Sequence, residues 1–280
     1  MGGYMQGQII KIVSDLHYVS CEDKVYPCKC RGIFRKEHIT PVVGDYVLFS
    51  SDKNLIEKIL PRKNEFERPK VSNIDQAFII TSLVNPDFSL NLLDKLLVLM
   101  ELHSVEAIIC ITKEDLVSED KLKEIYEVLD YYKKIGYKVV SNRDVSRIEE
   151  LIKDKTSVFT GQTGAGKSTL LNKINPDWNL ETGEVSIALG RGRHTTRVVE
   201  LFEIYGGKVM DTPGFSALDF NKYSKEEIRD AFREFRDFPC PFRDCMHTKE
   251  KECVVKENVL ANNILDSRYA NYLNFIGEDK

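Results

Sequence analysis

The sequence predicts a multidomain α/β protein with a small N-terminal β-barrel, a domain built on a mostly parallel sheet, and a helical C-terminal domain. Three observations predict this arrangement. Short strand-like runs fill the first 66 residues, strands and helices alternate from about residue 70, and four of the chain's Cys and His residues cluster between positions 240 and 253. We expect domain boundaries at 1–66, 67–220 and 221–280.

Composition excludes several classes of protein. The 280 residues are 42% apolar and 30% charged with a net charge of -4, as in an ordinary folded chain. No apolar run reaches the ~18 residues that span a bilayer, and the N-terminus has no signal pattern, so we expect a cytoplasmic protein without membrane segments. In that compartment the seven cysteines are thiols or metal ligands. Nothing in the sequence indicates an obligate oligomer, so we expect a monomer.

The first domain reads as four or five short strands at 8–13, 25–30, 45–49 and 55–59, with no helix. The common small barrel of this size is the OB-fold. Residues 1–66 carry ten Lys and Arg against eight Asp and Glu, so this part of the chain is slightly basic. Basic residues beside aromatic rings suit a nucleic-acid groove, although an ordinary solvated loop would look similar. The residues concerned are Tyr26, Lys29, Arg31, Phe34, Arg35, Lys36 and His38.

Alternating elements predict the second domain. Strands are expected at 74–83, 105–111, 137–140 and 157–160, and again at 198–204 and 208–210. Two helices are expected between the first three strands, and Ser89 and Ser118 are positioned to cap their N-termini. The first helix is expected to bury Leu92, Leu93, Leu96, Leu97 and Met100, and the second Leu122, Ile125, Tyr126, Leu129 and Tyr132. Such alternation predicts a mostly parallel sheet covered on both faces.

A phosphate-binding loop follows the strand at 157–160. The segment fits G-x-x-x-x-G-K-[ST], in which glycines let backbone N–H groups surround phosphate oxygens at a helix N-terminus. Lys167 would reach the β- and γ-phosphates, and the Ser168 hydroxyl would ligate Mg²⁺. The full set of expected nucleotide-contacting residues is Gly161, Gln162, Thr163, Gly164, Ala165, Gly166, Lys167, Ser168 and Thr169.

Two further elements follow this loop. Asp211 ends a predicted strand and could hold the Mg²⁺ shell, and Gly214 could offer its N–H to the γ-phosphate. Between the phosphate loop and Asp211 lies a long aperiodic segment, 175–197. Thr195 or Thr196 in this segment could complete the Mg²⁺ shell as a switch. The residues do not decide between these two threonines.

The element that selects the base comes early in the chain. Thr112, Lys113, Glu114 and Asp115 form a T-K-x-D motif at a predicted strand end, about 50 residues before Gly161. Asp115 could accept hydrogen bonds from guanine N1–H and N2–H₂, which adenine lacks, and Lys113 would lay its stem over the base. The Ser141 backbone N–H could contact the guanine carbonyl. The resulting order is a circular permutation of the usual G domain, which is feasible because domain termini commonly lie close together.

The C-terminal cluster has the spacing of a metal site. Cys240, Cys245, His247 and Cys253 supply four soft ligands within 14 residues, enough for one closed, structural Zn²⁺ site. Unconnected buried thiols are the alternative. A metal would add folding free energy that a segment with few apolar residues cannot obtain from its core. Cys21, Cys28, Cys30 and Cys110 are expected to be structural.

Together these motifs resemble the RsgA family of circularly permuted GTPases that depend on the small ribosomal subunit. The resemblance covers nearly the whole chain, from the barrel through T-K-x-D, the phosphate loop and D-T-P-G-F to C-x4-C-x-H-x5-C. It implies a GTP hydrolase that binds GTP with Mg²⁺, one Zn²⁺, the 30S subunit and 16S rRNA, and that assists late 30S maturation. Thr112 departs from the Asn of N-K-x-D, so guanine affinity could be weaker.

Catalysis requires a group that orients water. The usual Gln after D-x-x-G is replaced by Phe215, and the resemblance points to His194 instead. We therefore expect slow turnover that rises when the subunit orders residues 190–196, although His194 could instead contact phosphate or RNA. Two other functions share parts of these motifs: an ATP-dependent kinase, and a non-catalytic RNA-binding protein with a vestigial nucleotide site.

Overall fold

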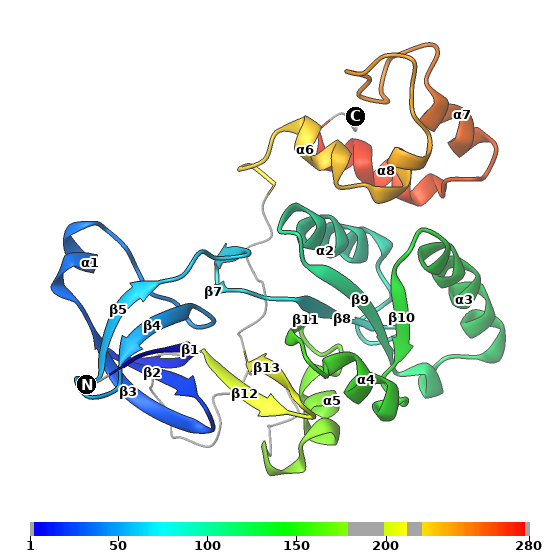
Figure 1. Ribbon diagram of the computed structural model, residues 1–280. Helices are drawn as coiled ribbons and strands as arrows, with labels where there is room; N and C mark the ends of the chain where they lie inside the picture. Colours follow the sequence, from blue (N-terminus) through cyan, green and yellow to red (C-terminus); the bar gives the residue numbers. More distant parts are fainter. Residues whose placement is uncertain (1–2, 179–198, 212–219, 278–280) are drawn as a thin grey trace.

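The computed structural model describes residues 3–178, 199–211 and 220–277. These residues form a barrel (residues 4–59), an α/β unit (residues 74–211) beside it, and a C-terminal module (residues 220–277) that lies over two helices of the α/β unit (Figure 1). None of the helices described is both long and apolar enough to cross a membrane.

The barrel is a closed, five-stranded, OB-like structure. Its strands pair in the order β1-β2-β3-β5-β4, and β4 closes the ring by pairing with β1. They are β1 (Tyr4–Val13), β2 (Leu16–Cys21), β3 (Lys24–Cys30), β4 (Tyr46–Ser50) and β5 (Leu55–Ile59). A short helix, α1 (Gly32–Lys36), follows β3, so the expectation of a domain without a helix was wrong. Ile9, Val47 and Phe49 are fully buried in the barrel core.

Helix α1 bears on the nucleic-acid groove, which the sequence left as one of two alternatives. Phe34 is only 6% exposed and packs into the barrel core, so its ring cannot stack on a base. Tyr26 is half-buried, and its ring centroid lies 5.1 Å from that of Phe49. Both rings stabilise the barrel by apolar burial. The basic residues Lys29, Arg31 and Lys36 are exposed as expected.

The α/β unit continues the sheet of the barrel. Five strands, β10-β9-β8-β11-β13, are parallel neighbours, and β12 pairs antiparallel with β13. A single pairing of Lys11 with Glu200 joins β1 to β12, and their side chains form an ion pair of 2.6 Å. The strands are β8 (Gln76–Ser82), β9 (Glu106–Thr112), β10 (Lys138–Ser141), β11 (Thr156–Gly161), β12 (Glu200–Ile204) and β13 (Gly207–Asp211).

Helices cover both faces of this sheet, as expected. Helices α2 (Leu90–Leu102) and α3 (Glu119–Lys134) pack on one face, and α4 (Val145–Ile152) and α5 (Lys167–Ile174) pack on the other. The Ser89 and Ser118 hydroxyls accept hydrogen bonds from backbone N–H groups in the first turns of α2 and α3, which confirms both predicted caps. Short 3-10 helices, η1 (Glu114–Leu116) and η2 (Pro176–Trp178), follow β9 and α5.

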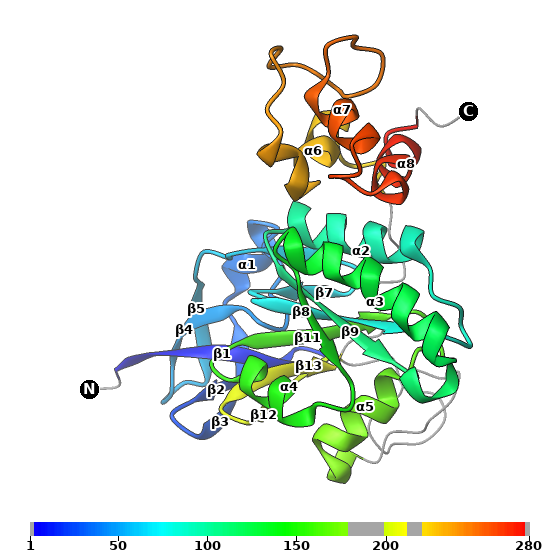
Figure 2. The same ribbon diagram turned by 90° about the vertical axis from the view of Figure 1, so that its right-hand side faces the viewer.

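The C-terminal module consists of short helices around an irregular loop. Its elements are α6 (Lys225–Asp230), η3 (Arg233–Asp237), α7 (Val254–Leu260) and α8 (Asp266–Phe275). Ser224 and Glu227 form a complete capping box at the start of α6. In both views the module lies beside α2 (Figure 2), and α8 is the element of the module that contacts α2 most.

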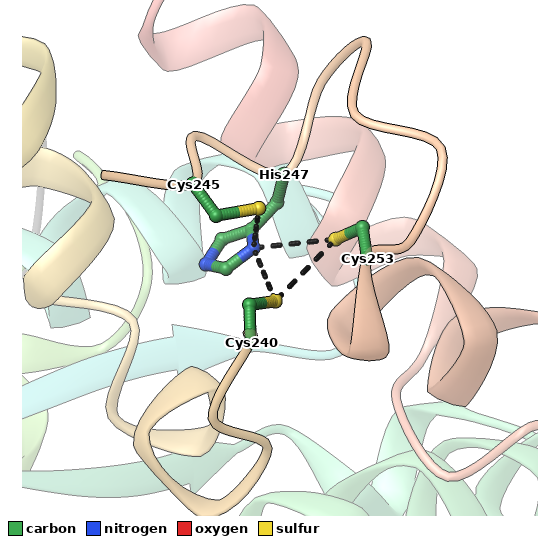
Figure 3. Close-up of side chains that lie close together, drawn as sticks. All are labelled: Cys240, Cys245, His247 and Cys253. Atoms are coloured by element: carbon green, nitrogen blue, oxygen red, sulfur yellow. Dashed lines mark hydrogen bonds between the residues drawn. The ribbon is translucent and has the colours of Figure 1, made fainter. Parts of the chain in front are cut away.

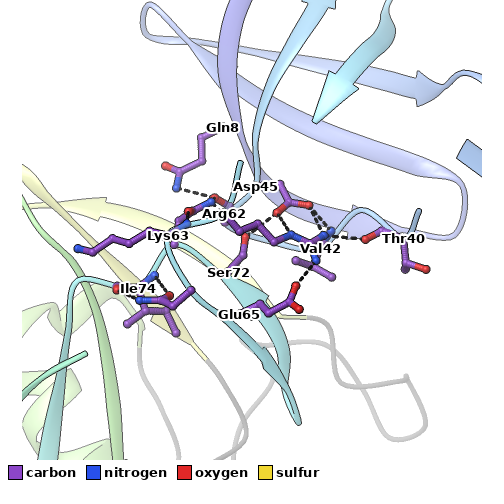
Figure 4. A network of polar contacts seen from close by, with 12 residues as sticks. Gln8, Thr40, Val42, Asp45, Arg62, Lys63, Glu65, Ser72 and Ile74 are labelled. Atoms are coloured by element: carbon purple, nitrogen blue, oxygen red, sulfur yellow. Dashed lines mark hydrogen bonds and ion pairs between the residues drawn. The ribbon is translucent and has the colours of Figure 1, made fainter. Parts of the chain in front are cut away.

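A buried carboxylate connects the barrel to the segment that leads into the α/β unit. Asp45 is fully buried and accepts hydrogen bonds from the Arg62 guanidinium at 2.7 and 2.9 Å and from the Ser72 hydroxyl at 2.7 Å (Figure 4). Arg62 lies just before the hairpin of β6 (Glu65–Glu67) and β7 (Lys70–Ser72). These contacts hold the hairpin against the barrel.

Replacing this carboxylate should destabilise the protein. Asp45→Asn removes the negative charge that compensates partly buried Arg62, so we expect the free energy of unfolding to fall by about 3 kcal/mol. Urea denaturation measures the change. Glu65→Gln is the matched control, because that carboxylate also pairs with Arg62 but is 63% exposed, and it should cost less than about 1 kcal/mol. Equal effects of the two substitutions would contradict this account of Asp45.

Candidate functional site

Four segments of the predicted nucleotide site meet at one edge of the sheet. Thr112 ends β9, Ser141 ends β10, Gly161 ends β11 and Asp211 ends β13. Because these strands are parallel, their carboxyl ends lie on the same side. In open α/β sheets this edge is where ligands bind. Segments from distant parts of the sequence therefore converge as the motifs predict.

The phosphate loop runs from the end of β11 into α5. Gly161 lies so close to β8 that a Cβ atom there would be 2.3 Å from the Ile80 carbonyl oxygen. Gly166 has φ +98° at the N-terminus of α5, a backbone conformation that favours glycine. Lys167 and Ser168 follow in the first turn and are half-buried. The loop residues Gln162, Thr163 and Gly164, together with Thr169 in the same turn of α5, are exposed.

A hydrogen bond joins the base motif to the phosphate loop. The Thr112 hydroxyl, which is fully buried, donates to the Ala165 carbonyl oxygen at 2.6 Å. Lys113 has a left-handed backbone conformation, and its ammonium group donates to the Asn85 carbonyl oxygen in the loop after β8. A threonine at the first position of the motif can therefore bridge the two loops.

The two acidic residues of the motif have different surroundings. Glu114 accepts hydrogen bonds from the Tyr126 hydroxyl at 2.5 Å and from the Ser141 hydroxyl, so it connects β9, α3 and β10. Burial, followed by the hydrogen bond to Glu114, raises the pKa of Tyr126 to about 12. The Asp115 side chain is 60% exposed and lies 3.2 Å from the Arg143 guanidinium. Asp115 is thus accessible to a ligand, whereas Glu114 orders the loop.

Several predicted residues lie outside what the structure describes. His194, Thr195 and Thr196 fall in the segment 179–198, and Gly214 falls in 212–219. Asp211 is the last residue of β13, where its backbone pairs with Glu200, and only its backbone is described.

The four predicted metal ligands come together in the C-terminal module (Figure 3). The Nδ1 atom of His247 lies 3.5, 3.4 and 3.3 Å from the sulfur atoms of Cys240, Cys245 and Cys253, and the Cys240 and Cys253 sulfur atoms are 3.8 Å apart. A tetrahedral ion with Zn–S of about 2.3 Å and Zn–N of about 2.0 Å requires separations of about 3.8 Å between sulfurs and about 3.5 Å between sulfur and nitrogen. The donor set therefore fits zinc.

The surrounding module holds these ligands in place. The Phe235 ring packs edge-on against His247 with centroids 5.1 Å apart, and the Tyr269 hydroxyl donates to the His247 carbonyl oxygen at 2.6 Å. Burial lowers the pKa of His247 to about 4 and raises the pKa of Cys245 to about 12. Neutral imidazole is the form that binds a metal, whereas the Cys245 thiol must lose its proton when zinc binds.

Family comparison agrees with this geometry. The RsgA N-terminal domain model matches residues 6–56, and the RsgA GTPase model matches residues 59–221. The chain belongs to the RsgA GTPase family. The resemblance drawn from its motifs is thus confirmed.

Individual relatives cover nearly all of this RsgA-family chain. The small ribosomal subunit biogenesis GTPase RsgA of Latilactobacillus sakei is 48% identical over 98% of this chain and 96% of its own length. Its counterpart in Enterococcus faecalis is 46% identical over 98% of this chain and 95% of its own length.

Two solved structures share the fold. YloQ, described as a circularly permuted GTPase, has a TM-score of 0.85 at 40% identity and matches 99% of this chain and 95% of its own. YjeQ from Thermotoga maritima has a TM-score of 0.87 at 35% identity, with 99% and 98% covered. The predicted fold class is confirmed, with its barrel, its circularly permuted α/β unit and a C-terminal module whose three Cys and one His could bind zinc.

Two residues near the base motif were not singled out for the site from the sequence. Tyr126 was assigned to the buried face of its helix, and Arg143 lies in a turn with no motif. Their roles depend on contacts across the sheet edge, to Glu114 and Asp115 respectively. A basic residue two positions after Ser141 is the one local signal that could have indicated Arg143.

Removing the Thr112 hydroxyl should weaken nucleotide binding. Thr112→Val keeps the side-chain shape but leaves the Ala165 carbonyl without its buried partner, at a cost of about 1–2 kcal/mol. We expect GDP and GTP to bind about 5- to 30-fold more weakly, measured by titration calorimetry. Thr112→Ser retains the hydroxyl and is the control. Unchanged affinity in Thr112→Val would show that the bridge does not support the pocket.

Loss of one zinc ligand should abolish metal retention. We expect Cys253→Ser to purify with almost no zinc and with an unfolded C-terminal module, because structural zinc supplies folding free energy. Metal analysis together with protease sensitivity of residues 240–253 measures both effects. Cys21→Ser, in the barrel, should retain about one zinc per chain. Full zinc content in Cys253→Ser would remove this residue from the ligand set.

Proposed function

We propose that this chain hydrolyses GTP, binds the small (30S) ribosomal subunit and assists its maturation. The observation that carries the proposal is the Thr112–Ala165 hydrogen bond, which joins a base-selecting motif to a phosphate loop encoded after it. The names of the relatives support the biological role, since they are small ribosomal subunit biogenesis GTPases. We further propose that the domains divide at 1–66, 67–220 and 221–280.

We propose that Asp115 selects guanine. Its exposed carboxylate can accept from guanine N1–H and N2–H₂, and the Lys113 stem can cover the ring while its ammonium group is held by the Asn85 carbonyl. Glu114 holds the Ser141 hydroxyl and so positions the start of the next loop, where the Ser141 N–H would meet the guanine carbonyl.

Phosphate binding falls to the loop at the start of α5. Backbone N–H groups from Gly161 to Thr169 surround the phosphates, and Lys167 contacts the β- and γ-phosphates. Ser168 and Asp211 would hold Mg²⁺, together with Thr195 or Thr196, and Gly214 would contact the γ-phosphate. The ion, when bound, neutralises charge on the phosphate oxygens.

Hydrolysis requires the segments beyond those described. Phe215 cannot orient water, so we propose that the His194 imidazole does so. Contact with the subunit would order residues 190–196 and raise the slow intrinsic rate. We propose that 16S rRNA binds the exposed basic residues of the barrel, Lys29, Arg31 and Lys36, and that the protein acts as a monomer in the cytoplasm.

Asp115→Asn should change purine selection. The amide presents a donor where guanine also has donors, so we expect GTP affinity to fall at least about 30-fold, a loss of about 2 kcal/mol. Xanthosine triphosphate, whose C2 carbonyl can accept from the amide, should gain affinity. Competition binding of GTP, XTP and ATP measures the selectivity. If the variant discriminates guanine from adenine as well as the parent does, the assignment of the base pocket to Asp115 is wrong.

His194→Ala should separate binding from hydrolysis. We expect GTP affinity to stay within about twofold, while 30S-stimulated hydrolysis falls by about 100-fold, as for loss of other water-orienting groups. Phosphate release with and without 30S subunits measures this. Undiminished stimulation in the variant would show that His194 does not orient the attacking water.

The phosphate-release assay on the parent protein, with competing nucleotides added, separates the alternative functions. ATP rather than GTP as the effective competitor would indicate a kinase, for which Asp115 has no use. Subunit binding without any hydrolysis would indicate an RNA-binding protein with a vestigial nucleotide site.

A further inference from the structure

Helix α2 has a second buried face that the sheet does not cover. Asn91, Asp94, Val98 and Glu101 are spaced three, four and three residues apart and so lie along one side of the helix. Each contacts the C-terminal module: Val98 packs in the apolar core of the module, and the other three pair with its polar side chains. The module therefore docks on α2 through a continuous stripe.

A fully buried arginine lies at the centre of this interface. Arg268, in α8, donates to Asp94 of α2 at 2.8 Å and to both carboxylate oxygens of Glu234 in η3 at 2.7 and 2.9 Å. Arg268 and Asp94 are 0% exposed and Glu234 is 1% exposed. Asp94 also accepts from the Tyr132 hydroxyl and the Asn271 amide, each at 2.6 Å. Every member of the network thus has charged or polar partners.

These partners come from both sides of the interface. Glu234 belongs to the C-terminal module, whereas Asp94 and Tyr132 belong to the α/β unit. Separating the two would leave Asp94 without its cation and would open the buried ion pair to water. Removal of one partner of a buried pair is far more costly than loss of an exposed pair. The docked interface therefore depends on the presence of both partners.

The same residues are adjacent to the zinc ligands. Tyr269, next to Arg268, donates to the His247 carbonyl oxygen, and Phe235, next to Glu234, packs on the His247 ring. Tyr272, one turn after Arg268, donates to the Met246 carbonyl oxygen at 2.5 Å. Helix α8 consequently holds the ligand loop on one side and Asp94 on the other. Collapse of the ligand loop would remove the support that positions Arg268.

We propose that Asp94 and Arg268 form an interdomain latch that couples zinc binding in the C-terminal module to the stability of the α/β unit. Zinc keeps α8 and η3 in place, these elements hold Arg268, and Arg268 stabilises α2 from outside the sheet. Coupling is reciprocal, so GDP bound to the α/β unit raises the affinity of the module for zinc. The latch goes beyond the proposed function, because it requires neither hydrolysis nor the ribosomal subunit.

The single tryptophan of the chain makes the coupling measurable. Trp178 packs against Phe202 at 5.4 Å in the α/β unit, so its fluorescence reports unfolding of that unit alone. We expect chelation of zinc from the full-length protein to lower the Trp178 unfolding midpoint by about 5 °C or more. In Asp94→Asn, which leaves the Arg268–Glu234 pair intact, the shift on chelation should be below about 1 °C. Zinc content of the variant should remain near one ion per chain.

Arg236→Met is the matched control. Arg236 also pairs with α2, through Glu101 at 3.5 Å, but it is 62% exposed, so this variant should keep the parental shift. A parent protein whose Trp178 midpoint is insensitive to chelation would overturn the latch without reference to any variant. A full parental shift in Asp94→Asn would do the same. The effect of GDP on zinc affinity, measured by equilibrium competition with a chromophoric chelator, is a second readout, expected in the parent and lost in Asp94→Asn.

Discussion

The hydrogen bond from Thr112 to Ala165 is the interaction on which the proposed nucleotide site depends. It joins two loops that are 53 residues apart in sequence and that follow strands on either side of β8. It can form because β9 and β11 are both parallel to β8, so their carboxyl ends reach the same edge. A sheet assembled in this way does not require its strands to come in any particular order along the chain. Permutation therefore leaves the pocket intact.

Local patterns predicted most of the elements because they carry their own signals. Ser89 and Ser118 lie where caps are needed, and the apolar spacing after them matches one helical face. The elements that sequence analysis missed have weaker signals. Strand β2 mixes polar and apolar residues, α4 is short, and α1 is a five-residue helix without a side-chain cap, ordered by burial of Phe34 in the barrel. Tertiary burial overrode local propensity there.

For the site, residue type and spacing were enough where the chemistry is contained in one short segment. The zinc cluster spans 14 residues, and its four predicted ligands lie together. The eight residues of the predicted phosphate loop connect a strand to a helix, as the motif requires. Arg268 could not be recognised in this way. Its partners Asp94 and Glu234 are 174 and 34 residues distant, and an arginine that follows the polar residues Asp266 and Ser267 looks like a solvent-exposed residue until the fold buries it. Sequence periodicity indicated one buried face of α2, and the second exists only because another part of the chain covers it.

The double burial of α2 also bears on how the nucleotide site and the C-terminal module communicate. The module follows β13 in the chain, whereas its docking surface is α2, which follows β8. Strand β13 is thus connected to the module along the chain. The helix that follows β8 is connected to it through the buried charges of Asp94 and Arg268. The α2 side chain Leu92 lines a small cavity together with Gln162 of the phosphate loop, and Asp94 lies two residues further along the same helix. The phosphate loop and the buried ion pair of Asp94 and Arg268 therefore both border α2 within its first two turns.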